Sequence, residues 1–84
     1  MAHAHPHEHP AGDDLAKLRA LLPHWIEHNE EHAASFREWA ARAREHGQED
    51  VAEAIAQAAQ RMEDVNAALE RALHVLEAGR TQGG

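Results

Sequence analysis

Apolar residues recur in steps of three and four along the first half of the chain, which is the spacing of one face of an α-helix. Asp13 or Asp14 is suited to cap the amino end of this helix. Gly47 follows its last turn, where glycine can adopt the left-handed conformation that ends helices. Two polar residues interrupt the apolar series. The face predicted to be buried comprises Leu15, Leu18, Leu22, Trp25, Asn29, His32, Phe36, Trp39 and Ala43.

Pro23 lies inside this predicted helix. Proline removes one backbone hydrogen bond and disfavours the helical conformation of the residue before it, here Leu22. The apolar series nevertheless keeps its phase across Pro23. We therefore expect a helix that is kinked or broken there, and in the second case restarts with Pro23 in its first position.

A second helix is predicted to begin at residues 48–50, where two acids suit its amino end, and to stop at Gly79. Its apolar residues alternate in steps of four and three over nearly four heptads. Leu73, Val75 and several alanines lie outside this series, so apolar surface covers more than one side of the helix. The series itself consists of Val51, Ile55, Ala58, Met62, Val65, Leu69, Ala72 and Leu76.

These patterns predict an all-α fold. The short connection makes the two helices antiparallel neighbours, so residues 13–79 should form a helical hairpin. Residues 1–12 should be a disordered His-rich tail and residues 80–84 a flexible carboxyl-terminal tail. A hairpin cannot cover all the apolar surface of the second helix, and an 84-residue chain struggles to build a sufficient core alone. We therefore expect a homodimer that forms a four-helix bundle.

Composition narrows the range of functions. The net charge is −7 with neutral histidines, and the few basic residues form no stripe, so nucleic acid and anionic membranes are poor partners. There is no cysteine, hence no disulfide or thiolate metal site. No apolar run reaches the ~20 residues that span a bilayer, and residues 1–12 lack the apolar segment of a secretory signal. We expect a cytoplasmic protein.

The candidate chemistry lies in three histidines at i, i+4 and i+8, namely His24, His28 and His32, which share one helix face. Imidazoles at i and i+4 can clamp a transition-metal ion. His24 and His32 lie about 12 Å apart along the axis, so only the pairs His24/His28 or His28/His32 can bind one ion. Glu27, Glu30 and Glu31 lie close enough to repel one another, which a cation would relieve.

Further ligands are expected from the second helix. Helix rise places His32 level with Glu63, His28 level with residues 66–70, and His24 level with residues 70–74. One predicted cluster therefore unites His24 and His28 with Glu70 and His74, and a second unites His28 and His32 with Glu63. His32 has an alternative role with equal support, as a core residue hydrogen-bonded to one partner.

The amino-terminal tail adds four more candidate ligands. Histidines alternate there with small residues, proline and glutamate, which is typical of a metal-collecting tract. An affinity tag is the alternative interpretation, although alternation broken by proline differs from the usual uninterrupted run. The tail histidines are His3, His5, His7 and His9.

An enzymatic role is disfavoured. The segments 24–28 and 28–32 both match H-x-x-E-H, the inverted zinc-protease signature. That motif counts only in its structural context, and this chain is too short to form a substrate cleft beside the helix. The Glu-x-x-His motif of di-iron bundles is absent from the sequence.

The stretch Pro23-His24-Trp25-x-x-His28-Asn29-x-x-His32, followed by a second helix that opens with residues 49–52, resembles a group of small prokaryotic helical proteins of uncharacterised activity. The resemblance covers residues 15–77 and implies a link to nickel or cobalt handling. The sequence thus favours a non-catalytic metal-binding protein: a chaperone, buffer or sensor for nickel, cobalt, zinc or copper, with a metal-handling protein as partner. The alternative is a helical-hairpin dimerisation or interaction module without a specific metal.

Overall fold

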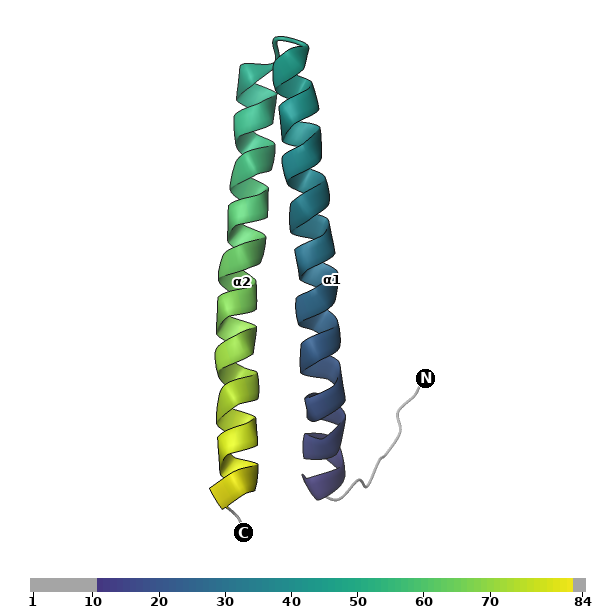
Figure 1. The fold of residues 1–84 in the computed structure, drawn as a ribbon, viewed down its shortest axis with the longest axis vertical. Helices are drawn as coiled ribbons and strands as arrows, with labels where there is room; N and C mark the ends of the chain where they lie inside the picture. The colour runs from purple at the N-terminus through teal and green to yellow at the C-terminus, as the bar shows by residue number, and fades with distance from the viewer. Residues whose placement is uncertain (1–10, 83–84) are drawn as a thin grey trace, which may run out of the picture.

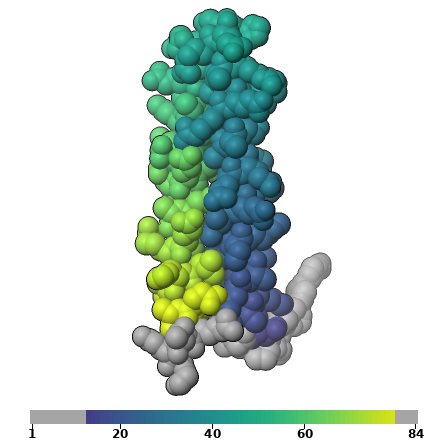
Figure 2. All heavy atoms as spheres, viewed as in Figure 1, coloured from purple at the N-terminus to yellow at the C-terminus, as the bar shows by residue number. Residues whose placement is uncertain are grey.

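The computed structural model describes residues 11–82 of the chain, which form two long helices. Helix α1 spans Ala11–Glu45 and helix α2 spans Glu49–Gln82. They run antiparallel as a hairpin, with the start of α1 and the end of α2 at the end opposite the connection (Figure 1). The all-α hairpin predicted from the sequence is therefore confirmed. The space-filling view shows the two helices in contact along their length (Figure 2).

The turn between the helices forms as the sequence predicts. Gly47 has a φ of +78°, the left-handed conformation that side chains with a Cβ disfavour. Its amide donates to the carbonyl of Arg44 at 2.9 Å, and the Gln48 amide donates to the carbonyl of Ala43 at 2.9 Å. These two bonds define a Schellman motif and occupy carbonyls that the end of α1 leaves free. The Gln48 carbonyl then accepts from Ala52 and begins α2.

The outer helix ends differ from those expected. Helix α1 begins at Ala11 and runs through Pro23 without interruption, so the break considered at Pro23 does not occur. Leu22 and Ile26, on either side of Pro23, are both buried against α2, which holds the helix together across the lost hydrogen bond. Helix α2 continues past Gly79 to Gln82. Glycine inside a helix costs only about 1 kcal/mol, too little to force an end.

The interior is thin and made mainly of alanine. The buried apolar residues are Leu22, Ile26, Ala33, Ala40, Ala52 and Ala59. Among the described residues, no large side chain is completely buried. The radius of gyration is 18.4 Å, against about 12 Å for a compact chain of this length. The hairpin is therefore a single layer whose core is one narrow seam.

This seam lies one row of side chains away from the predicted one. Trp25 and Trp39, predicted to be core residues, are 40% and 54% exposed. In α1, residues seven positions apart form rows along the helix, and two neighbouring rows could face the interior. One contains Ile26 and Ala33, and the other contains Trp25 and His32. Helices pack with their axes 8–10 Å apart, which leaves room for alanine but not for indole rings. The smaller row is buried, and α2 likewise buries Ala52, Ala59 and Asn66 in place of Val51, Ala58 and Val65.

A buried polar contact fixes the register of the helices. Asn66 is only 6% exposed, and its amide nitrogen donates to the backbone carbonyl of Ile26 at 2.9 Å. The Asn29 amide donates in turn to the side-chain oxygen of Asn66 at 3.0 Å. An axial slip of either helix would leave these groups buried without partners. The contact places Asn29 level with Asn66, which confirms the register predicted from helix rise.

Candidate metal-binding site

The three histidines of α1 form a ladder of rings on the outside of the hairpin, and all three are exposed. The rings of His24 and His28 are stacked with centroids 6.2 Å apart. Those of His28 and His32 meet edge to face at 4.6 Å, and Phe36 follows His32 at 5.9 Å. The i, i+4 spacing along one helix thus brings successive imidazoles into contact, as the sequence predicts.

The closest approach is between His28 and His32, whose Nε2 atoms are 3.1 Å apart. With no ion present, this is a hydrogen bond in which one Nε2–H donates to the other nitrogen. Two imidazole nitrogens on one ion, each at ~2.05 Å, are separated by about 3.3 Å at the tetrahedral angle and about 2.9 Å at a right angle. The observed separation falls between these values. The distance between the two nitrogens therefore suits two ligands of one ion.

Carboxylates lie beside His24 and His28 on the same helix. His24, Glu27, His28 and Glu31 together line a small hollow on the surface of α1. The glutamates sit one helical turn apart, so their negative charges raise the local concentration of cations. They do not themselves complete a ligand set. Within residues 11–82, three or more metal-ligating side chains nowhere converge on one point that could hold an ion.

The predicted partners on α2 lie at the expected levels but on other sides of the hairpin. Glu63 faces away from the histidine ladder and binds Arg37, with 2.8 Å between the guanidinium and carboxylate groups. Glu70 and His74 line a separate hollow on α2 with Arg71. The structure therefore does not unite His24 and His28 with Glu70 and His74, nor His28 and His32 with Glu63.

The remaining predicted positions divide into two groups. His32 is exposed and contacts His28, so its alternative role as a core residue bonded to Asn29 or Glu63 is wrong. The histidines predicted as tail ligands lie outside the described residues: His3, His5, His7 and His9.

One feature of the site region was not predicted, namely a continuous apolar face beside the histidine ladder. It carries Trp25 and Trp39 from α1, and Val51 and Val65 from α2, all at least 40% exposed. The sequence does carry an indication of this face. It is the row of apolar residues that fits the helical period but whose side chains are too large for the seam. In the part of the chain that the structure describes, neither helix has an apolar stretch that could span a bilayer.

Comparison with known families gives one match. Residues 18–76, more than half of the chain, match the model of a domain of unknown function, DUF8180. The chain therefore belongs to this family. The matched region contains the histidine ladder, the Asn29–Asn66 contact and the turn at Gly47. Searches of curated proteins and of solved structures give no match.

Proposed function

We propose that this chain is a non-catalytic transition-metal-binding protein that buffers, delivers or senses its ion. The observation that carries the proposal is the 3.1 Å separation of the His28 and His32 Nε2 atoms, which suits two ligands of one ion. The pair lies on a continuous helix, so its backbone is rigid. Such preorganisation reduces the entropy lost when the ion binds.

The donor set restricts the class of ion. Imidazole suits nickel, cobalt, zinc and copper, whereas magnesium and calcium prefer oxygen ligands. Glu27 and Glu31 contribute attraction to any of these cations and select none of them. The resemblance of the Pro23–His32 stretch to small prokaryotic proteins favours nickel or cobalt. The role as buffer, chaperone or sensor, together with a metal-handling partner protein, belongs to the same proposal.

The test is metal content followed by titration. The 84-residue chain with glutamine in place of His3, His5, His7 and His9, termed the tail-silent chain, is purified without an affinity tag. Its metal content is measured by inductively coupled plasma mass spectrometry. The protein is then stripped with a chelator and titrated with nickel, cobalt and zinc by calorimetry. The proposal predicts saturable binding at substoichiometric or stoichiometric ratios. The absence of saturable binding of any of these ions would refute it.

A second function is favoured by a different observation. Trp39 is 54% exposed beside Val51, and such large apolar groups in a row mark interaction surfaces. On this alternative, the chain is a helical-hairpin module that forms a homodimer, and its histidines tune assembly as they gain charge at acidic pH. A dimer that forms equally well with and without added metal, in a chain that shows no measurable metal binding, would establish this alternative in place of the first proposal.

A further inference from the structure

The exposed apolar residues gather on one side of the hairpin. Rows of residues seven positions apart locate them. Next to the buried row of Ile26, Ala33 and Ala40 lies a row that contains the buried Leu22 and the half-buried Phe36. One step further round follow three exposed side chains, Trp25, His32 and Trp39. Helix α2 repeats this order, with Val51, Ala58, Val65 and Ala72 in its outer row. Because the helices are antiparallel, both outer rows lie on the same side of the hairpin.

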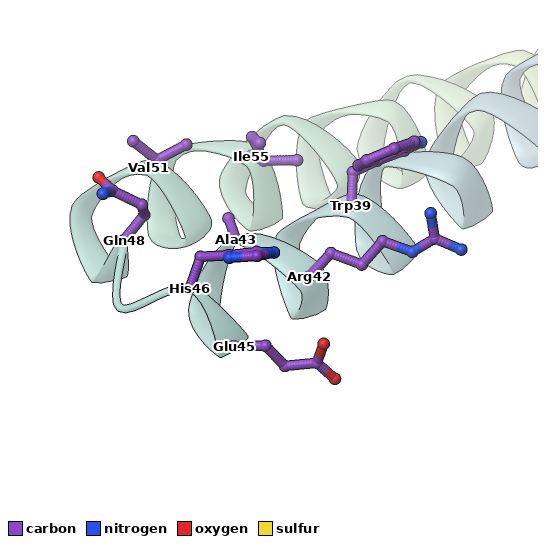
Figure 3. A pocket seen from close by; sticks show the side chains of 8 residues that line it. All are labelled: Trp39, Arg42, Ala43, Glu45, His46, Gln48, Val51 and Ile55. Atoms are coloured by element: carbon purple, nitrogen blue, oxygen red, sulfur yellow. The ribbon is translucent and has the colours of Figure 1, made fainter.

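Two apolar hollows confirm that this side combines both helices. Trp39, Val51 and Ile55 form the apolar part of one hollow near the turn, whose edge carries Arg42, Glu45 and His46 (Figure 3). Leu22, Ala72 and Leu76 belong to the second hollow, at the opposite end of the hairpin. The next row of α1 contains Leu21, His28, Ser35 and Arg42, and α2 has a matching row. We use the term acid-free face for these two rows together with the outer rows and the apolar hollow-lining residues named above.

The name reflects the distribution of charge. Between residues 15 and 76, every aspartate and glutamate occupies a row outside this face, although the chain has a net charge of −7. The interhelical ion pairs Arg37–Glu63 and Arg44–Glu49 lie on the opposite side. The carboxylates nearest to this face, Glu27, Glu31 and Glu45, lie along its edge on α1. The rows inside the face carry none, so they can meet a second copy of themselves without carboxylates facing each other.

The size of the face also suits a dimer. Helix α1 has 35 residues and is therefore about 50 Å long, and two helices side by side are about 20 Å wide. One copy thus offers roughly 1,000 Å² of contact, against about 800 Å² per partner in a stable interface of standard size. The single copy has a seam built mainly from alanine, so it gains stability from covering Trp25 and Trp39.

The histidine pair lies halfway along the length of this face, on its α1 side. The Asn29–Asn66 contact sets the level of the two helices, and the middle of the face falls level with Glu30 on α1 and Val65 on α2. His28 and His32 lie about 3 Å to either side of that level. When two hairpins stack with their turns at opposite ends, a residue above the midpoint of one copy faces a residue equally far below the midpoint of the other. Only residues at the midpoint face their own counterparts. His28 of one copy then lies beside His32 of the other.

From this placement we propose that two copies pack their acid-free faces together with their turns at opposite ends. The His28–His32 pairs of both copies then meet at the two-fold axis and offer four imidazole nitrogens to one transition-metal ion. This inference rests on the proposed metal-binding function and adds that each copy holds half of the site. Two nitrogens per copy are too few for an ion that takes four ligands, and two copies supply that number.

The same arrangement accounts for neighbouring side chains. With α1 antiparallel to α1 of the second copy about the level of Glu30, Trp25 lies opposite Ser35, and Trp39 lies opposite Leu21. A small residue opposite one indole and an apolar residue opposite the other allow both rings to be buried between the helices. On α2, Val65 lies opposite Val65, and Ala58 lies opposite Ala72, so these helices can approach closely.

Stoichiometry provides the first test, in the tail-silent chain. Light scattering coupled to size exclusion should give a dimer, and nickel or zinc titration should saturate at one ion per two chains. His28→Ala and His32→Ala should each lower the affinity at least tenfold, while His74→Ala, on the outer surface of α2, should not. One ion per monomeric chain would overturn the shared site and leave the proposed function standing. No saturable binding would refute the proposed function itself.

Covalent trapping tests the orientation without metal. The described residues contain no cysteine, and Val65 and Val51 are both 47% exposed, so single cysteines at these positions form a matched pair. On mild oxidation with diamide, Val65→Cys should convert to a disulfide-linked dimer because the position meets its own copy. Val51→Cys should remain largely monomeric on a denaturing gel, since it lies opposite residue 79. Equal yields, or faster trapping of Val51→Cys, would overturn the proposed arrangement.

Discussion

Replacement of Asn66 by alanine probes the contact that sets the level of the histidine pair. Asn66 accepts a hydrogen bond of 3.0 Å from Asn29 and donates one of 2.9 Å to the Ile26 carbonyl, with 6% of the residue exposed. Each buried hydrogen bond contributes about 0.5–1.5 kcal/mol, and the higher helix propensity of alanine returns about 0.6 kcal/mol. Asn66→Ala should therefore lower the free energy of unfolding by roughly 1–2 kcal/mol.

Urea denaturation followed by circular dichroism at 222 nm measures this change, at one fixed protein concentration because the proposed dimer would link stability to concentration. Gln60→Ala is the matched control. Its amide donates to Asp64 at 3.1 Å, a bond of similar length that lies on the exposed surface. Replacing Gln60 should change stability by less than about 0.5 kcal/mol. If Asn66→Ala costs no more than Gln60→Ala, the buried contact does not set the register, and the reasoning fails.

The remaining predictions concern the turn, the acid-free face and the tail. Gly47→Ala should destabilise the hairpin by about 1 kcal/mol because of the positive φ, whereas Gly79→Ala, helical with open space around it, should stabilise it by up to about 1 kcal/mol; thermal melts that show the same sign for both would contradict this. Val65→Glu should convert the dimer to a monomer in sedimentation velocity, because two carboxylates would face each other, while Ala67→Glu on the outer surface should leave it intact. Glutamine at His3, His5, His7 and His9 should lower total metal capacity without removing the tightest site; loss of all binding would refute the proposal that the His28–His32 pair carries the function.

The sequence sufficed for the elements that local chemistry determines. Steps of three and four gave both helices, and Gly47 gave the turn, since a left-handed residue after the last helical position strongly favours glycine. The rotation of each helix about its own axis could not be predicted from the sequence. Two adjacent rows in α1 fit the helical period, and only the space between two helices decides that Ala33 is buried and Trp25 is not.

The candidate site divides in the same way. Spacing alone placed His28 beside His32, because i and i+4 are neighbours on any helix. Helix rise also gave the correct level of Glu63 opposite His32. Helix rise does not show, however, which side of the hairpin a residue occupies. Glu63 binds Arg37 on the side opposite the histidines. Ligands on one helix are predictable from sequence, whereas those that depend on the relative rotation of two helices are not.

Nickel titration of histidine variants tests the central claim most directly. In the tail-silent chain, His28→Ala should weaken binding at least 10–100-fold, the loss that removal of even an outer-shell partner typically causes. His46→Ala, near the turn and away from the His28–His32 pair, should leave the affinity unchanged. Equal affinities of His28→Ala and His46→Ala would contradict the account, and would show that the histidine ladder is a solvated surface.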